Sequence, residues 1–113
     1  CGIIQRSVYA TIQIGSDPKN LNVLLGPSIR QCCFEVGHDV ARQFDSSYIT
    51  RGINGRSMVN LQSIVTYQLE KLGVKNKKIV DLKECTCCQE KRYHSFRRDG
   101  KDAGRMIAIL GWN

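Results

Sequence analysis

The chain has 113 residues, of which 42% are hydrophobic, and it carries 17 Lys or Arg against 10 Asp or Glu. This length suits one domain, residues 1–113, with a single core, and because no apolar run approaches membrane-spanning length we expect no membrane partner. The net charge of +7 favours anionic ligands, but its dispersal along the chain argues against nucleic acid as a partner.

The chain has six cysteines among 113 residues, a smaller share than the roughly 8–10% that marks a disulfide scaffold. Five of them cluster at 32–33 and 85–88, Cys1 stands alone, and adjacent cysteines rarely bridge to each other. We therefore expect reduced thiols and a cytoplasmic protein. The opening "CGIIQRSVYA" has neither a basic leader followed by an apolar region nor an initiating Met, so we expect a processed, trimmed or partial chain.

Hydrophobic periodicity predicts the elements of the first half of the chain. Apolar residues at every fourth position predict helices over 2–14 and 35–44. The stripes consist of Ile4, Val8 and Ile12 in the first helix and of Val36, Val40 and Phe44 in the second. The short apolar run "NVLLG" at 22–26 predicts a buried strand, and residues 45–56 are expected to form a polar loop.

The second half predicts one more helix and three strands. Residues 58–72 carry a strong apolar stripe, with Ser57 as the expected N-cap and Gly73 as the left-handed residue after the last turn. Strands are expected at 77–82, 92–97 and 105–112, the last two joined by a turn at 98–104 and the final one central in its sheet. The fold class is therefore α+β, a mixed α/β arrangement.

The cysteines offer thiol or metal chemistry beside a plainer interpretation. Cys85 and Cys88 have the C-x-x-C spacing of a zinc or redox pair. The side chains of Cys32 and Cys33 should diverge on any regular backbone, so four ligands are not expected to converge. No histidine or acid is positioned by sequence to activate Cys33 as a nucleophile. Free thiols that pack as small hydrophobes are the favoured interpretation.

Arg97 and Arg98 are candidate anion-binding residues. A guanidinium offers a planar donor fork that suits phosphate or carboxylate. In the predicted strand only one of the two could face a given pocket. A solvated turn, with the arginines paired to Asp99 or Asp102, explains the spacing slightly better, and both interpretations stay open.

Five segments of the chain form a recognisable series: Gly26-Pro27-Ser28-Ile29, Cys32-Cys33-Phe34-Glu35-Val36-Gly37, Cys85-Thr86-Cys87-Cys88, Ser95-Phe96-Arg97-Arg98-Asp99 and Gly104-Arg105-Met106. Together they resemble the C-terminal half of the laccase-domain family, the YfiH type, which has also been described as polyphenol oxidase or multicopper oxidase-like. They follow one another in the family's order. The resemblance implies a layered α/β/β/α fold, shared with the toxin domain of cytotoxic necrotizing factor.

The resemblance also implies an activity on purine nucleosides: phosphorolysis of adenosine, inosine, guanosine and methylthioadenosine, with deamination of adenosine. The family's zinc is held by two histidines and a cysteine, in Gln-Val-His, Asp-Cys-x-Pro and His-Ala-Gly-Trp-Arg-Gly segments that this sequence lacks. No residue here is therefore assigned as a metal ligand. The copper of the older description would need a histidine-rich ligand set that is also missing.

We therefore expect the C-terminal portion of such an enzyme, inactive alone, with the N-terminal half of the same protein as its partner and purine nucleosides and phosphate as ligands. No catalytic residue is assigned. The substrate-pocket candidates are Cys33, Phe34, Arg97 and Arg98, with the 26–34 turn and the 94–98 strand as pocket edges. The alternatives are a small basic nucleic-acid-binding module or an interaction module stabilised by zinc on Cys85 and Cys88.

Overall fold

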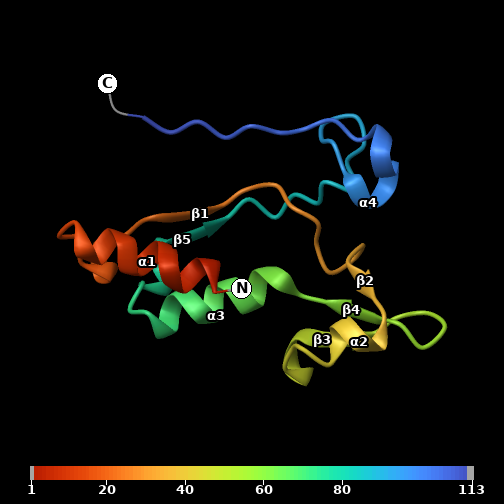
Figure 1. Ribbon diagram of the computed structural model, residues 1–113, viewed down its shortest axis with the longest axis horizontal. Coiled ribbons are helices and arrows are strands. Elements are labelled where there is room, and N and C mark those ends of the chain that lie inside the picture. The colour runs from red at the N-terminus through yellow and green to blue at the C-terminus, as the bar shows by residue number, and fades with distance from the viewer. Residues whose placement is uncertain (1, 112–113) are drawn as a thin grey trace.

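A computed structural model describes residues 2–111 and contains both helices and short strands, which confirms the mixed α/β class. In chain order the elements are α1 (Ile3–Gln13), β1 (Val23–Leu25), β2 (Glu35–Val36), α2 (His38–Ala41), β3 (Ile49–Arg51), β4 (Ser57–Val59), α3 (Leu61–Lys71), β5 (Ile79–Asp81) and α4 (Phe96–Asp99). Helix α1 and strands β1 and β5 lie at one end of the molecule, β2, β3, β4 and α2 lie at the other, and α3 runs between the two ends (Figure 1).

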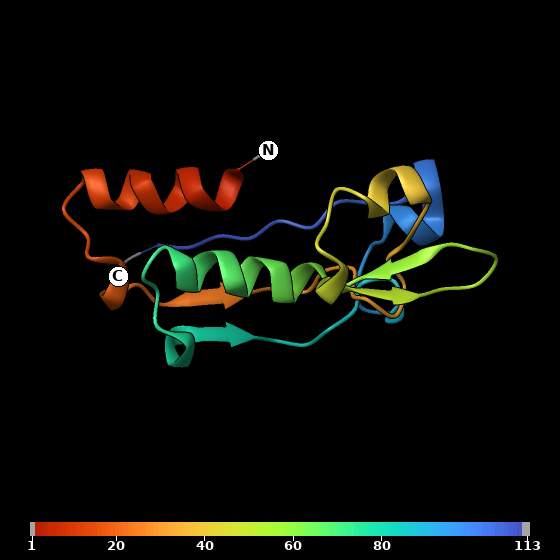
Figure 2. The same ribbon diagram turned by 90° about the horizontal axis from the view of Figure 1, so that it is seen from below.

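The first end is built on a two-stranded parallel sheet. Strands β1 and β5 pair in register from Val23 opposite Ile79 to Leu25 opposite Asp81. Helices α1 and α3 run alongside these strands (Figure 2). Their apolar stripes meet in a core centred on Val8, Leu69 and Val74. The predicted helix at 2–14 and the predicted strands at 22–26 and 77–82 are thus confirmed. The expected burial of the first strand is wrong, because only one partner strand lies beside it and Leu24 is 63% exposed.

The second end is a three-stranded antiparallel sheet in the order β2-β4-β3. Its core contains Val36, Ala41 and Val59, and Val59 is completely buried. Leu61 and Ile64 from the first turns of α3 pack on the same core. Helix α3 therefore takes part in both hydrophobic clusters and holds the two sheets together.

Helix α3 confirms the predicted helix but begins later than predicted. Its N-cap is Asn60, whose side chain accepts a hydrogen bond from the amide of Ser63. The expected cap, Ser57, lies in β4 instead, because β4 pairs with strands on both sides. At the other end Gly73 has a φ of 95°, and the amides of Gly73 and Val74 donate to the last carbonyl groups of the helix.

Two predictions for the first half are wrong. Residues 35–44 do not form one helix: the chain makes strand β2, and α2 then spans only four residues. The apolar spacing in this stretch does not mark one continuous helix, because Val36 lies in a strand and Val40 lies in a single helical turn. Residues 45–56 are not simply a loop, since they contain β3 and a hairpin turn in which Asn54 and Gly55 both have positive φ. Asn-Gly is the residue pair that such a turn favours.

The predictions for the last part of the chain also fail. Residues 92–95 are irregular and 96–99 form helix α4, so there is neither a strand at 92–97 nor a hairpin turn at 98–104. Residues 105–111 are extended and belong to no sheet of the described chain, and the end of the predicted strand, Trp112, lies outside the described residues. This segment runs back along the length of the molecule (Figure 1). Its apolar sequence has the composition of a strand but finds no partner among residues 2–111.

Among the described residues, no helix combines the length and the apolar character needed to cross a membrane.

We predict that Gly73→Ala lowers the free energy of unfolding by about 1–2 kcal/mol, because a side chain in the left-handed region is strained. Chemical denaturation of the two proteins measures this difference. Gly26→Ala is the matched control, since Gly26 does not have a positive φ and a Cβ there meets no atom within 4 Å. Equal losses for both variants would contradict the assigned role of Gly73.

Candidate functional site

The loops that follow the two parallel strands are joined beyond the strand ends. Leu82 donates its amide to the carbonyl of Leu25 at 3.1 Å. The amide of Ser28 then donates to the carbonyl of Glu84 at 3.2 Å, and the amide of Thr86 donates back to Ser28 at 3.1 Å. These bonds place residues 26–34 beside residues 82–95. The carboxyl ends of parallel strands are also where α/β proteins commonly bind ligands.

An ion pair reinforces this junction. The guanidinium of Arg30 donates two hydrogen bonds to the carboxylate of Asp81, at 2.8 and 2.7 Å. These bonds, opposed by partial burial, hold the pKa of the Asp81 carboxyl below its usual value and raise the pKa of Arg30. The side-chain amide of the buried Gln62 donates to the Ser28 hydroxyl and to the Ile29 carbonyl, which fixes the first loop from the other side.

Four thiols converge at the junction. The Sγ atoms of Cys32, Cys33, Cys85 and Cys88 all lie within 4.8 Å of one another, and that of Cys88 lies 3.6 Å from Cys32 and 3.3 Å from Cys33. The expectation that the two adjacent cysteines diverge is wrong, because the chain makes a turn there in which the Cys33 amide bonds to the carbonyl of Arg30. The rule of diverging neighbours applies to regular strands and helices only.

The surroundings of the thiols differ in ways that shift their pKa values in opposite directions. Burial, followed by the hydrogen bond with Cys88, raises the pKa of Cys33 and raises that of Cys32 to about 11. Burial also acts upward on Cys85, but backbone amides outweigh it and lower the pKa of Cys85 to about 6. Within the cluster, the lowered pKa of Cys85 favours its thiolate, whereas the raised pKa values of Cys32 and Cys33 favour their protonated thiols.

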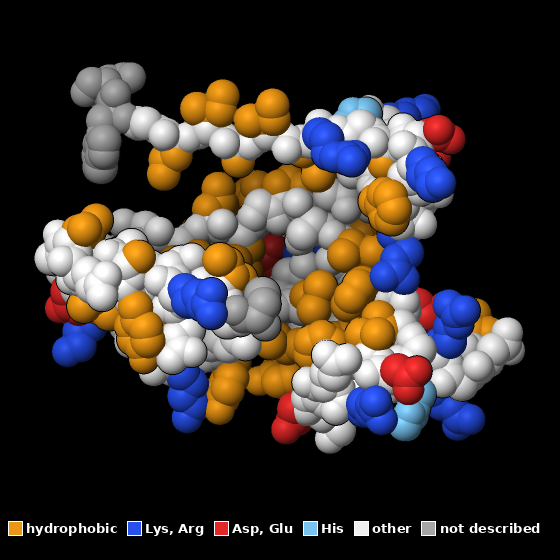
Figure 3. Space-filling view, viewed as in Figure 1, with side chains coloured by type: hydrophobic (Ala, Val, Ile, Leu, Met, Phe, Trp, Pro, Cys, Tyr) orange, Lys and Arg blue, Asp and Glu red, His pale blue; other side chains and the backbone are white. Residues whose placement is uncertain are grey.

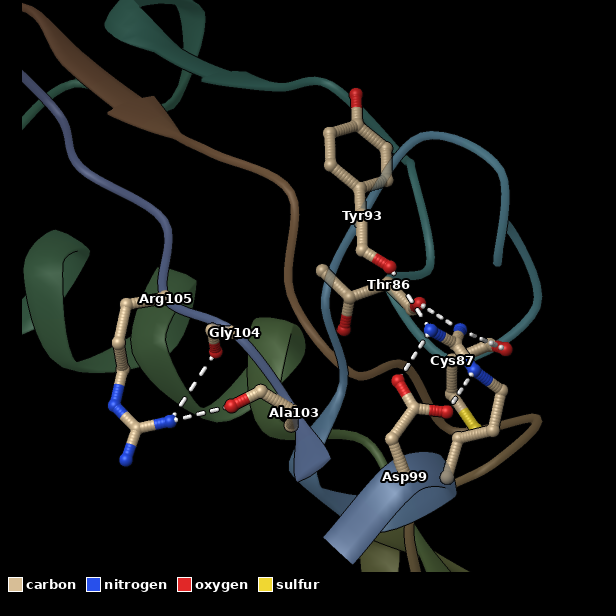
Figure 4. A network of polar contacts seen from close by, with 8 residues as sticks. Thr86, Cys87, Tyr93, Asp99, Ala103, Gly104 and Arg105 are labelled. Atoms are coloured by element: carbon tan, nitrogen blue, oxygen red, sulfur yellow. Dashed lines mark hydrogen bonds and ion pairs between the residues drawn. The ribbon is translucent and has the colours of Figure 1, made fainter. Parts of the chain in front are cut away.

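Arg98 is fully occupied by structural contacts. Its Nε and one Nη donate to the carboxylate of Asp99 at 2.7 and 2.6 Å. Its remaining donors reach the carbonyl groups of Thr86, Cys87 and Tyr93 at 3.0 to 3.1 Å (Figure 4). All five N–H donors of a guanidinium are accounted for by these bonds. Arg98 therefore ties helix α4 to the 86–93 loop.

Arg97 points elsewhere, because successive residues of a helical turn face different sides. One Nη of Arg97 donates to the carbonyl of Glu35 at 2.7 Å. Its guanidinium carbon lies 5.3 Å from the centre of the Phe34 ring, in cation–π contact. The side chain is otherwise exposed, and its other N–H donors have no protein partner among residues 2–111.

An open hollow of about 580 Å³ lies next to Glu35. Its lining comes from residues 32–35, from the β3–β4 hairpin and from the 82–95 loop. The lining residues are Cys32, Cys33, Glu35, Arg51, Gly52, Ile53, Met58 and Cys87. Of the four sequence-predicted pocket residues, Cys33 lines this hollow, Arg97 lies over the ring of Phe34, which follows Cys33 in the chain, and Arg98 is committed to Asp99. Sequence reasoning missed Arg51, whose only signal was its place before the Asn54-Gly55 turn.

The histidine-containing metal site implied by the family resemblance does not fit this chain. Among the described residues, the one group of side chains with metal-binding geometry consists of four cysteines and contains no histidine. A catalytic zinc site needs three protein ligands and an open position. The residues that this chain brings together therefore do not form that catalytic centre.

The arrangement is that of YfiH-type proteins. The structure matches the solved hypothetical protein YfiH of Bacillus licheniformis with a TM-score of 0.77 at 26% sequence identity, and the match covers 86% of this chain and 39% of that one. The family model described as multi-copper polyphenol oxidoreductase laccase matches residues 1–113. The chain therefore belongs to the laccase-domain family, and membership in it implies a metal.

Two relatives carry the names of enzymes that act on purine nucleosides. A purine nucleoside phosphorylase of Clostridium acetobutylicum is 32% identical over 98 residues, which cover 84% of this chain and 41% of the relative. Adenosine deaminase RL5, from an unknown prokaryotic organism, is 29% identical over 100 residues, which cover 82% of this chain and 38% of the relative. The chain thus spans about two fifths of the length of these curated relatives and belongs to a family of purine nucleoside enzymes.

We predict that Asp81→Asn lowers the free energy of unfolding at neutral pH by about 1.5–3 kcal/mol, because charged hydrogen bonds to Arg30 are lost. The pKa of Asp81 is depressed by folding, so its contribution is fully present above the ordinary value of 3.8 and is lost as the pH falls through the depressed value. Urea unfolding at a series of acidic pH values should show a shallower loss of stability for Asp81→Asn.

Asp102→Asn serves as the control, since Asp102 is exposed and the structure gives its carboxylate no hydrogen bond within residues 2–111. A pH dependence that is identical in the unmodified chain and in Asp81→Asn would contradict the assigned ion pair.

Proposed function

We propose that this chain forms one wall of the active site of an enzyme that cleaves purine nucleosides with phosphate and deaminates adenosine. The names of the relatives support the reaction class. In phosphorolysis a phosphate oxygen attacks the ribose C1′, the bond from C1′ to the purine nitrogen breaks, and the purine leaves with the bonding electrons and takes up a proton. The site must therefore hold a phosphate dianion close to the nucleoside.

The observation that carries the proposal is that the two adjacent arginines make different contacts. Arg98 has no donor left for a ligand, whereas Arg97 is held in place by Phe34 and by the Glu35 carbonyl with donors to spare. A guanidinium fixed in this way loses little entropy when it binds an oxyanion. Arg97 would bind and orient the phosphate.

Arg51 supplies a second positive charge, in the lining of the hollow that also contains Cys33. Apart from Arg51 and Glu35 the lining of this hollow is mainly apolar, with Met58, Ile53 and the thiols of Cys32 and Cys33. Ligand pockets commonly combine an apolar lining with a few charged groups that fix orientation. The ring of a purine nucleoside would lie along the apolar lining while its phosphate co-substrate contacts the arginines.

The chain exposes more surface than a compact domain of its size. Its accessible area is 8663 Å², against about 6,300 Å² for a folded monomer of the same mass. Its radius of gyration is 15.8 Å, against about 13 Å for a compact chain of this length. The difference of about 2,400 Å² lies in the range that permanent protein interfaces bury.

The excess surface is apolar in two places. Leu24 and Val80 face outward from the parallel strands, and in the C-terminal segment Ile107, Ile109 and Leu110 are 85%, 92% and 99% exposed. Hydrophobic side chains follow this segment and surround the hollowed region beside it (Figure 3). Exposed apolar patches of this extent mark interaction sites. We infer that a second portion, equivalent to the remainder of the relatives' length, covers them and adds a strand partner for residues 105–111.

That second portion would also carry the histidine and cysteine segments through which the family resemblance implies zinc. Zinc supplies Lewis-acid and water-activating chemistry to a site that contains it. The share of this chain would be to bind phosphate and to shape the nucleoside pocket, so the chain on its own would have no turnover.

The product of the complete coding sequence that contains this chain tests the proposal. We expect phosphorolysis of inosine or adenosine with added phosphate, and we expect Arg97→Ala to raise the KM for phosphate by about 10- to 100-fold, because charge-assisted hydrogen bonds to the anion are lost. Initial rates at varied phosphate concentration measure the change, and Arg97→Lys should recover part of it.

Arg42→Ala is the control for net charge, since Arg42 is an exposed arginine at the end of α2. An unchanged KM for phosphate in Arg97→Ala would remove Arg97 from the site. Failure of the complete protein to cleave any purine nucleoside would refute the proposed function itself.

A further inference from the structure

The four clustered thiols have a geometry that packing alone does not require. They come from two loops separated by more than fifty residues, and the Sγ of Cys88 lies 3.6 Å from Cys32 and 3.3 Å from Cys33. Cys87, which adjoins the cluster in sequence, is not one of its members. Two of the four side chains, Cys32 and Cys88, are exposed at the surface rather than placed in a hydrophobic core.

We propose that Cys32, Cys33, Cys85 and Cys88 together bind one zinc ion in a closed tetrathiolate site that joins the 26–34 and 82–95 loops. Zinc–sulfur bonds of about 2.3 Å in a tetrahedron place the sulfur atoms about 3.8 Å apart. The four Sγ atoms, all within 4.8 Å of one another, need only small side-chain rotations to reach this spacing.

The donor set favours zinc in a structural role. Four soft thiolates arranged as a tetrahedron are typical of zinc or of an iron–sulfur centre. With four protein ligands no coordination position remains for water or substrate, which is the arrangement of structural zinc sites. Zinc would take up the thiolates, and the thiol protons would pass to solvent.

The backbone around the site is suited to a bound metal. The amide of Gln89 donates to the carbonyl of Cys85 at 3.1 Å, so residues 85–89 form a turn. A turn across a C-x-x-C segment lets both of its sulfur atoms face one metal ion.

A disulfide explains the cluster less well. One disulfide would use two of the four sulfur atoms at a separation of about 2.05 Å and leave the other two in the same small volume without a role. The Sγ atom of Cys88 lies 3.6 Å from Cys32 and 3.3 Å from Cys33, well beyond the length of an S–S bond. Two disulfides within so compact a group would need both adjacent cysteines to reach across to Cys85 and Cys88 at once.

The zinc site would set the position of the residues beside it. Phe34 directly follows Cys33, and the carbonyl of Cys87 accepts a hydrogen bond from Arg98. Metal binding would therefore stiffen both the ring beneath Arg97 and the loop that anchors α4. This role is independent of the nucleoside chemistry and stands whether or not the proposed function does.

The metal content of the complete protein, purified under reducing conditions from zinc-supplied cells, tests the site. Elemental analysis should find one zinc ion fewer in Cys88→Ser than in the unmodified protein. The zinc affinity should fall at least about 100-fold, because losing a metal ligand weakens binding more than losing a residue that only supports a ligand. Cys87→Ser, which changes the neighbouring thiol outside the cluster, should keep its full zinc content. Equal loss in both variants, or iron or copper bound in place of zinc, would overturn the proposal.

Residue-resolved alkylation of the unmodified protein gives a second test that does not depend on a variant folding. Cys32, Cys33, Cys85 and Cys88 should resist a thiol reagent until zinc is removed by a chelator and then react together, while the reactivity of Cys87 should not depend on zinc. Prompt reaction of Cys88 in the zinc-loaded protein would overturn the site. Protection that only a reductant removes would identify a disulfide instead and would do the same.

Discussion

The rest of the structure depends on the parallel pairing of β1 with β5 and on its continuation through the Ser28–Cys85 bridge. Parallel strands end at the same edge, so two loops that are distant in sequence leave the sheet side by side. The bonds that cross between the loops, together with the Arg30–Asp81 ion pair, keep them adjacent for several residues more. The thiol cluster, the ring of Phe34 and the anchoring of α4 all follow from this adjacency.

The site shows how two identical neighbouring side chains acquire different roles. Arg98 fills its donors with carbonyl groups of the 86–93 loop and with Asp99, and it is thereby a structural residue (Figure 4). Arg97 faces the other loop and rests on Phe34. In a strand at 96–99 the two side chains would also have faced opposite ways. The helical turn of α4 is what gives each arginine its own loop to contact.

The sequence predicts those elements that local patterns determine, and it does not predict contacts between segments that are distant along the chain. Helices α1 and α3 have apolar stripes, and strands β1 and β5 follow short apolar runs, so the sequence predicted these four elements, although α3 begins later than expected and Leu24 of β1 is exposed. The Asn54-Gly55 pair was a sufficient hairpin signal that was overlooked. By contrast, no local pattern could have turned Cys32 and Cys33 toward Cys88, because that contact exists only after β1 and β5 have paired. Residues 105–111 have the composition of a strand, yet a strand needs a neighbour, and the described chain offers none.

Amide hydrogen exchange measured by NMR tests the central claim most directly, because it reports whether the two loops remain hydrogen-bonded beyond the ends of β1 and β5. The amides of Leu82 and Thr86 donate across the junction to Leu25 and Ser28, so they should exchange as slowly as amides of the parallel strands themselves. The amide of the buried Val74, which donates to the carbonyl of Leu69, gives a protected reference outside the junction. Exchange of Leu82 and Thr86 at the rate of unprotected amides, while Val74 and β5 stay protected, would contradict the account.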